Sequence, residues 1–381
     1  MRNVFRIIVM TASLFLIFSR LLKTEEILPP KVEAHSAILI DQATGRVLWE
    51  KDAYAPMSMA STTKIMTAIL ALELGRPSDI AKVSKRAAAA PRMKMNLQAG
   101  EEISLESLLY ALMLESANDA AVVIAEHISG SVEQFCIQMT QKAQELGAKD
   151  TVFKTPNGLD SENHHSTAYD MAQITRYALT NPEFVRIINT RQIDLKSSRT
   201  TYSMHNKNRM LNEFEGATGV KTGYTGKAGY CFVGSAKRDD MQLISVVFAS
   251  GWGPKGREQK WTDSKHILDF GFEHYEYHDI IVENEQVGVI DIVRSKTHEI
   301  PVKFARPLNL PMTAEELEKV EILPSYPLVL QAPVEADAIV GAAKIYIDDE
   351  LVDTIELITV SYAERHDFMT SLRKLIDYLT K

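Results

Sequence analysis

A serine and a lysine three residues apart, Ser61 and Lys64, have the types and spacing of a nucleophile and its base. A serine hydroxyl is a weak nucleophile until a neighbouring base takes its proton. Residues three apart on a helix share one face, so the Lys64 amine can reach the Ser61 oxygen. The amine acts as a base only when neutral, which requires burial or nearby cations to lower its pKa. The pattern by itself is common, because Ser371 and Lys374 repeat it in the tail.

A second pattern, Ser116-Ala-Asn118, interrupts an apolar helical stretch. Polar groups in such a stretch are costly to bury unless they face a cleft or find partners. Ser116 could relay a proton, and Asn118 could hold Lys64 and a substrate amide. A polar turn between two helices is the alternative for an isolated match, and Ser161 with Asn163 repeats the spacing.

The third pattern, Lys221-Thr222-Gly223, occurs once and is predicted to open a strand. The lysine would add positive potential to a cleft, and the threonine hydroxyl could bind a carboxylate. The glycine would let a ligand approach the backbone closely. Ser-x-x-Lys, Ser-x-Asn and Lys-Thr-Gly in this chain order form the signature of class A β-lactamases and penicillin-binding proteins.

Longer segments extend the signature to a family. They are residues 109–121, residues 157–160 with residues 166–172, and residues 221–229. In these segments the chain resembles the serine D-alanyl-D-alanine carboxypeptidases of peptidase family S11, including the Bacillus sporulation-type members and the enterobacterial low-molecular-mass penicillin-binding proteins. The likeness is strong over residues 34–275 and extends to the layout of the remainder.

The resemblance implies catalytic roles for the three patterns. Ser61 would attack the carbonyl of the penultimate D-alanine of a peptidoglycan stem peptide and form an acyl-enzyme, with Lys64 as the base. Ser116 and Lys221 would pass the proton to the leaving D-alanine, and Asn118 would orient the groups. β-Lactam antibiotics would acylate Ser61, because they present a strained amide to the same nucleophile.

The resemblance also implies the substrate contacts. The backbone N–H groups of Ser61 and Tyr224 would form the oxyanion hole. Thr222 and a family arginine, for which Arg257 is the candidate, would bind the terminal carboxylate beside Gly223. No metal or organic cofactor is implied.

Two other sets of polar residues, Asp170 and the pair His164 and His165, lie between the second and third patterns. Asp170 matches a family aspartate near the site, or else caps the helix that follows. His164 and His165 lack spaced partners and are interpreted as loop residues rather than metal ligands.

The predicted elements describe the fold that must position these residues. Strands are expected at residues 36–41, 47–49, 229–236 and 241–249, and helices at residues 61–74, 105–114, 119–128, 132–146, 168–179, 182–188 and 261–270. This pattern predicts an α+β, penicillin-binding/β-lactamase-like transpeptidase domain over residues 34–275, with an antiparallel sheet flanked by helices plus a helical cluster. Short strands separated by prolines and charges predict a small β-rich domain at residues 276–361.

The two ends suggest where the protein acts. Arg2 and Arg6 precede an apolar run at residues 7–18, which is typical of a secretory signal. Residues 1–24 are therefore predicted to direct export, either cleaved or retained as an anchor. Residues 362–381 form an amphipathic pattern that could lie flat on a membrane or pack on its own domain. With the family resemblance, we expect it to hold the enzyme at the outer face of the cytoplasmic membrane.

Composition excludes some functions and leaves others open. The net charge of −8 argues against a nucleic-acid partner, because neutralising phosphates requires a basic face. Two cysteines are too few for a disulfide framework and are interpreted as unpaired. A class A-like β-lactamase, a D,D-endopeptidase and a catalytically silent scaffold binding penicillin or wall peptide are the alternatives to the carboxypeptidase.

Overall fold

The computed structural model describes residues 27–366 and 368–380. The chain divides into two compact units, one spanning Pro29–Glu273 and the other containing His274–Lys381. The predicted signal or anchor segment at residues 1–24 lies outside the described residues.

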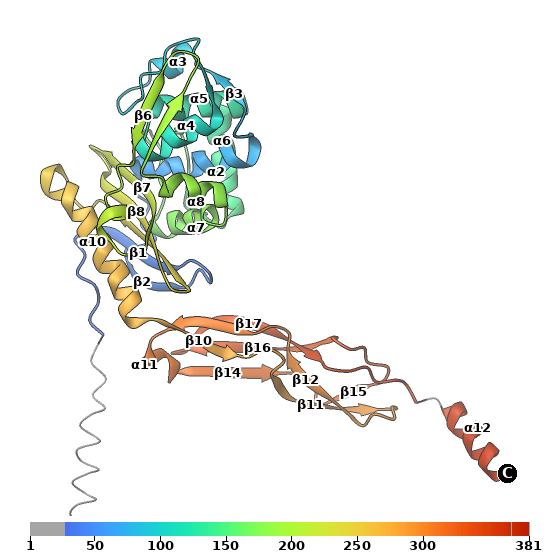
Figure 1. The fold of residues 1–381 in the computed structure, drawn as a ribbon. Coiled ribbons are helices and arrows are strands. Elements are labelled where there is room, and N and C mark those ends of the chain that lie inside the picture. The colour runs from blue at the N-terminus through green and yellow to red at the C-terminus, as the bar shows by residue number, and fades with distance from the viewer. Residues whose placement is uncertain (1–26, 367, 381) are drawn as a thin grey trace, which may run out of the picture. The chain divides into compact units, whose positions relative to one another are not determined.

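A five-stranded antiparallel sheet forms the centre of the first unit, in the order β2-β1-β9-β8-β7 (Figure 1). Its strands are β1 (Ser36–Asp41), β2 (Val47–Lys51), β7 (Ala217–Thr225), β8 (Gly229–Arg238) and β9 (Met241–Phe248). The predicted strand pair at residues 36–49 and the returning strands at residues 229–249 are confirmed. Neighbours in sequence point to opposite faces of a sheet, so both faces of this buried sheet need a cover.

The long helix α10 (Gly253–His274) covers one face. Gly271 lies against Leu39 and Leu243, where an added Cβ would come within 2.8 Å of both side chains. Trp261 packs edge-on against Phe232, with ring centroids 4.7 Å apart. A predicted helix at residues 261–270 is therefore confirmed, and it is longer at both ends.

The helical cluster covers the other face. Ile38 and Ile40 of β1 share one core cluster with side chains of α2 and α7, such as Ile65 and Met171. The helical part contains η1 (Ala60–Thr63), α2 (Lys64–Leu74), α3 (Lys85–Ala88), α4 (Leu105–Tyr110), η2 (Ala111–Glu115), α5 (Asn118–Ser129), α6 (Val132–Glu145), α7 (Ala168–Ala178), α8 (Pro182–Asn189) and α9 (Met210–Glu213), with two small strand pairs, β3 (Ile80–Lys82) with β4 (Glu102–Ser104) and β5 (Gln192–Lys196) with β6 (Thr201–His205). Cys136 and Cys231 are buried free thiols, as predicted.

Three sequence predictions are wrong in detail near the patterned residues. The helix expected from Ser61 begins at Lys64, after the 3-10 turn η1. The helix expected over residues 105–114 changes to a π-helix at Ala111. Lys221 lies in the middle of β7 and does not open the strand.

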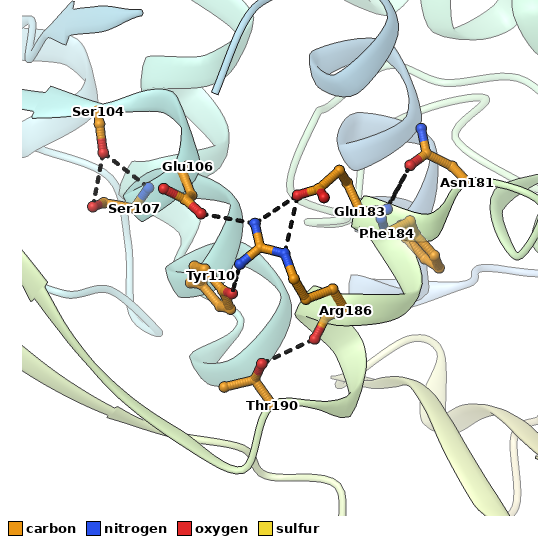
Figure 2. A network of polar contacts seen from close by, with 9 residues as sticks. All are labelled: Ser104, Glu106, Ser107, Tyr110, Asn181, Glu183, Phe184, Arg186 and Thr190. Carbon is orange, nitrogen blue, oxygen red and sulfur yellow. Dashed lines mark hydrogen bonds and ion pairs between the residues drawn. The ribbon is translucent and has the colours of Figure 1, made fainter. Parts of the chain in front are cut away.

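Helix α8 packs on both β7 and η2. Strand β7 contains Lys221-Thr222-Gly223, and η2 ends at its C-cap, Ser116. Gly219 of β7 accommodates Ile188, whose Cδ1 would lie 2.6 Å from an added Cβ. Arg186 ties α8 to α4, as Figure 2 shows. Its guanidinium donates to Glu106 at 2.7 Å and to the Tyr110 hydroxyl at 2.6 Å, and within its own helix it pairs with Glu183. The ion pairs of this network are about half exposed.

The second unit is mostly β structure and has its own apolar core. A six-stranded sheet has the order β14-β16-β17-β12-β11-β15, with only the β11–β15 pair parallel, and β10 pairs with β13. The elements are β10 (Glu276–Ile281), β11 (Gln286–Val293), β12 (Glu299–Phe304), β13 (Leu308–Met312), α11 (Ala314–Leu317), β14 (Val320–Ser325), β15 (Val329–Gln331), β16 (Ile339–Ile347), β17 (Glu350–Thr359) and α12 (Phe368–Leu379). The predicted α+β architecture with a small β-rich second domain is confirmed.

Helix α12 lies within the tail segment predicted to be helical. Ile376, Tyr378 and Leu379 are exposed on it. Within residues 27–366 and 368–380, no helix combines the length and apolar character needed to cross a bilayer. Association of the tail with a membrane surface stays a prediction.

Candidate active site

The turn η1 carries Ser61 and is fixed by the threonines that follow it. Thr62 donates its hydroxyl hydrogen bond to the Met59 carbonyl at 2.6 Å, and Thr63 donates to the Ala60 carbonyl at 2.8 Å. Threonine hydroxyls that bond to nearby backbone carbonyls in this way compete with regular helix. Ala60 has a φ of +48°, an unusual conformation for a residue with a Cβ. The local sequence therefore makes a tight turn that presents Ser61 ahead of α2.

Lys64, the first residue of α2, points back at Ser61. Its Nζ lies 2.9 Å from Ser61 Oγ, and it donates to Asn118 Oδ1 at 2.9 Å and to the Asn157 carbonyl. A neutral amine has two N–H groups for the latter two contacts and a lone pair that can accept from the Ser61 hydroxyl. The Lys64 side chain is fully buried. A serine oxygen and a buried amine within hydrogen-bonding distance form the first two members of an activated nucleophile.

Asn118 begins α5 and is held from both sides. Its Nδ2 donates to the carbonyls of Pro91 and Arg92 at 3.2 and 3.0 Å, while its Oδ1 accepts from Lys64. Ser116 sits two residues earlier, in a left-handed conformation with φ of +62° that ends η2. The Ser116-Ala-Asn118 pattern therefore forms a turn between η2 and α5, and its asparagine contacts Lys64.

Lys221 and Gly223 bring the edge strand β7 to the same place. Lys221 is buried, and its Nζ donates to the Thr222 carbonyl at 3.1 Å. Gly223 packs against η1 so closely that an added Cβ would lie 2.9 Å from the Ser61 nitrogen. A glycine is required here because any side chain would push the strand away from the turn. The backbone of β7 therefore runs beside the Ser61 N–H group.

The pKa values of both lysines are lowered, and the cause is mainly burial. Desolvation, followed by the positive charge of Lys221, lowers the pKa of Lys64 well below its ordinary value. Desolvation and the charge of Lys207 lower the pKa of Lys221 to about 7. Asp119 opposes the effect on Lys64. Both shifts favour the neutral amine, which is the form that a base requires.

Tyr224 and Arg257 form a second group with Tyr230. Tyr224 is about half exposed at the end of β7 and stacks on Tyr230, with ring centroids 4.3 Å apart. Arg257 is exposed on α10, and its Nε donates to the Tyr230 hydroxyl at 3.3 Å. Direct hydrogen bonds thus join Ser61, Lys64 and Asn118, whereas Arg257 is linked to β7 through tyrosines.

A loop after residue 154 contributes a group that the patterns did not predict. The Asn157 carbonyl accepts from Lys64 and from Ser61 Oγ, the latter at 3.3 Å. Gly158 has a φ of +81°, and an added Cβ would overlap the Ala60 carbonyl oxygen. A main-chain carbonyl has no side-chain signature, so residue spacing could not reveal it. The turn sequence Pro156-Asn-Gly158 was the available signal.

His164 and Asp170 are also better defined in the structure than in the sequence. His164 lies in a loop, as expected, and is buried, with 3% of its surface accessible. Asp170 lies in the first turn of α7, and its carboxylate accepts from the Asp150 N–H and the Thr151 hydroxyl. The N-cap of α7 is Thr167, so Asp170 fastens a neighbouring loop and does not cap that helix.

Comparison with known proteins identifies the family. A family model described as D-alanyl-D-alanine carboxypeptidase, peptidase S11, matches residues 23–251, and one described as penicillin-binding protein 5, C-terminal domain, matches residues 275–365. The chain is 34% identical to D-alanyl-D-alanine carboxypeptidase DacF of Bacillus subtilis over 356 residues, covering 92% of this chain and 90% of the relative. It is 29% identical to DacA of Escherichia coli over 366 residues, covering 92% and 88%.

Solved structures show the same likeness. Penicillin-binding protein 5 from Haemophilus influenzae matches with a TM-score of 0.76 and 25% identity, covering 89% of this chain and 100% of that chain. Penicillin-binding protein 6B from Escherichia coli matches with a TM-score of 0.67 and 27% identity, covering 88% and 99%. The chain therefore belongs to the S11 family of D-alanyl-D-alanine carboxypeptidases.

Proposed function

We propose that this chain, a serine D-alanyl-D-alanine carboxypeptidase, removes the terminal D-alanine of peptidoglycan stem peptides through an acyl-enzyme on Ser61. The observation that carries the assignment is the 2.9 Å contact between Lys64 Nζ and Ser61 Oγ. Burial holds the pKa of Lys64 low, so a neutral amine faces the hydroxyl. The family shown by the comparisons supplies the reaction, and this contact supplies its nucleophile and base.

Acylation begins when Lys64 takes the Ser61 proton. The Ser61 oxygen then attacks the carbonyl of the penultimate D-alanine, and the carbonyl oxygen becomes negatively charged. The N–H groups of Ser61 and Tyr224 donate to that oxygen, which stabilises the tetrahedral intermediate. The close approach of Gly223 to Ser61 supports this role, because it brings the two backbones side by side.

The intermediate collapses by breaking the bond to the terminal D-alanine. The leaving amine needs a proton, and Ser116 with Lys221 would deliver one that Lys64 had accepted. The pKa of Lys221, lowered to about 7, suits both accepting and donating a proton near neutral pH. Water then attacks the ester, with Lys64 or Lys221 as base, and releases the shortened peptide and free Ser61.

The terminal carboxylate of the substrate determines where the peptide is cut. Thr222 on β7 would donate its hydroxyl hydrogen bond to this carboxylate, and Lys221 and Arg257 would supply positive charge. Arg257 is exposed and hydrogen-bonded to Tyr230, which leaves its guanidinium available at the surface. The same contacts would accept the carboxylate of a β-lactam, which acylates Ser61 through its strained amide.

We further propose that the enzyme works at the outer face of the cytoplasmic membrane. Family members are periplasmic or cell-wall-side enzymes. Residues 1–24 would direct export, and the amphipathic tail at residues 362–381 would bind the membrane surface. Fractionation tests this: a chain ending at residue 361 should leave the membrane fraction and keep its activity. Retention of a shortened chain from which residues 1–24 have been cleaved, as checked by mass spectrometry, would refute the tail assignment.

A purified-protein assay tests the chemistry. Wild type should release D-alanine from a diacyl-D-Ala-D-Ala peptide and bind a fluorescent penicillin covalently, and Ser61→Ala should do neither. Ser371→Ala is the matched control, because it removes the serine of the other Ser-x-x-Lys match, and it should behave as wild type. D-alanine release by Ser61→Ala would refute the nucleophile.

A further inference from the structure

His164 is a buried histidine whose two ring nitrogens bond to different segments of the chain. Its Nδ1 lies 3.0 Å from the main-chain nitrogen of Lys154, and its Nε2 lies 3.0 Å from Thr63 Oγ1. A main-chain N–H can only donate, so Nδ1 must accept and carries no proton. The proton of the neutral ring is therefore on Nε2, which donates to Thr63.

Thr63 passes this contact on to the nucleophile turn. Its hydroxyl accepts from His164 and donates to the Ala60 carbonyl at 2.8 Å. Ala60, in its left-handed conformation, precedes Ser61, and Thr63 precedes Lys64. Fixing the Thr63 hydroxyl therefore fixes the turn on both sides of Ser61.

The other contact closes a loop. Lys154 and His164 stand at the two ends of the loop over residues 154–164, and their hydrogen bond joins those ends. This loop contains Asn157, whose carbonyl accepts from Lys64, and Gly158, which lies against Ala60. Thr67 of α2 donates to the Pro156 carbonyl at 2.6 Å, a further tie of the loop to the helix that begins at Lys64.

We infer that His164 is a positioning residue for acylation: it clasps the loop over residues 154–164 and docks it on the turn that carries Ser61. A single neutral ring performs both tasks, because one nitrogen accepts from the loop and the other donates to the turn. The inference rests on the proposed function of the site. As a consequence, the Asn157 carbonyl and Ser61 are both held within hydrogen-bonding distance of Lys64.

The electrostatic surroundings keep the ring neutral. Burial lowers the pKa of His164 to about 4, and the charges of His165 and Lys227 act in the same direction. A protonated ring would turn Nδ1 into a donor facing the Lys154 N–H, so the clasp requires the neutral form. The clasp is therefore maintained at neutral pH.

The test is the rate of acylation by a fluorescent penicillin, measured with full-length protein. His164→Phe keeps the ring and removes both polar contacts, and we expect acylation to slow by about ten- to hundredfold, the effect of a small misplacement of reacting groups. His164→Gln can retain the donor to Thr63, so its rate should lie between those of His164→Phe and wild type. Wild-type rates in both variants would overturn the inference.

Two further variants separate positioning from general stability. Thr63→Val removes the hydroxyl that accepts the hydrogen bond from His164 and should slow acylation to a similar extent. The double variant with His164→Phe should be no slower than either single variant. If His164→Phe does not fold, the acylation rate of Thr63→Val still tests the inference. His165→Phe is the matched control, because the main chain of His165 pairs with Val152 outside this cluster, and it should acylate as wild type. Additive losses in the double variant would overturn the inference.

Nitrogen NMR of histidine-labelled protein tests the hydrogen-bond pattern of the clasp directly. One histidine, absent from the His164→Gln spectrum, should carry its proton on Nε2 and stay neutral well below pH 6. A proton on Nδ1 would contradict the clasp. D-alanine release by Ser61→Ala would instead refute the proposed function, so the two failures are distinguishable.

Discussion

The two units differ in what they bury. The β-rich unit encloses an apolar core, and its buried polar residues among those described are two threonines, Thr313 and Thr359. The unit spanning Pro29–Glu273 buries ionisable side chains as well: Asp41, Lys64, Glu101, Asp119, His164, Asp170, Lys221, Lys260 and Asp263. A buried charge is costly unless it is paired or hydrogen-bonded, so each of these needs a reason to persist.

The reasons fall into two kinds. Several carboxylates fasten backbone: Asp119 accepts from the N–H groups of Met95 and Leu97 at 3.1 Å each, and Asp263 accepts from those of Glu33 and Ala34 at 3.0 Å each. The two lysines of the site instead have pKa values lowered mainly by burial, with the charge of Lys221 adding to the effect on Lys64 and that of Lys207 to the effect on Lys221. Strongly shifted amines in a buried cluster are typical of chemistry, whereas satisfied carboxylates are typical of structure. The comparison therefore supports the proposal that the chemistry belongs to the unit spanning Pro29–Glu273.

The largest effect we expect comes from removing the proposed base. Lys64→Met should lower the acylation rate by about 10²- to 10⁴-fold, the usual contribution of a general base. Stopped-flow acylation with a fluorescent penicillin measures it, and circular dichroism checks the fold. Lys82→Met, an exposed lysine on β3, is the control and should leave the rate unchanged. Acylation within tenfold of wild type would mean that Lys221 alone suffices as the base.

A cavity made in the core of the β-rich unit should lower stability and leave the acylation rate unchanged. Ile345 is fully buried in the core of the β-rich unit. Ile345→Ala should lower the free energy of unfolding of that unit by about 2–5 kcal/mol and leave acylation at 25 °C unchanged, because no proposed site residue lies in it. Urea denaturation measures the loss. Val289→Ala, at an exposed position of the same unit, should cost far less. A parallel fall in acylation would break the division between the units.

His164 should contribute a distinct part of the pH dependence of stability. Burial lowers its pKa to about 4, against about 6.5 in an unfolded chain. Between these values the unfolded chain binds a proton that the folded chain does not, so the free energy of unfolding falls as the pH falls. The loss should approach about 3 kcal/mol at pH 4 and then stop growing. The free energy of unfolding, measured by urea denaturation at pH 7 and at pH 4.5, should fall less between these pH values in His164→Gln than in wild type. An equal fall in both proteins would contradict the burial argument.

How much of this could be predicted from the sequence depends on the kind of group. The sheet, most helices and the convergence of Ser61, Lys64 and Asn118 follow from periodicity and from three motifs in a known order. The 3-10 turn at Ala60–Thr63 was not predicted, because threonine-to-backbone bonds override helical spacing there. The Asn157 carbonyl and the His164 clasp depend on how a loop folds back, which no local pattern encodes.

The smallest effect should come from the network of Figure 2, which combines charges without burying them. Arg186 is about half exposed and pairs with Glu106 and Glu183. Arg186→Met should cost only about 1 kcal/mol, because exposed ion pairs are screened by water. Acylation should stay at the wild-type rate, since α8 is held on β7 and η2 by buried contacts such as that between Ile188 and Gly219. Thermal denaturation with acylation measured in parallel tests both expectations. A large fall in acylation would show that exposed charges also position the site, and burial would no longer separate the chemical residues of this unit from the rest.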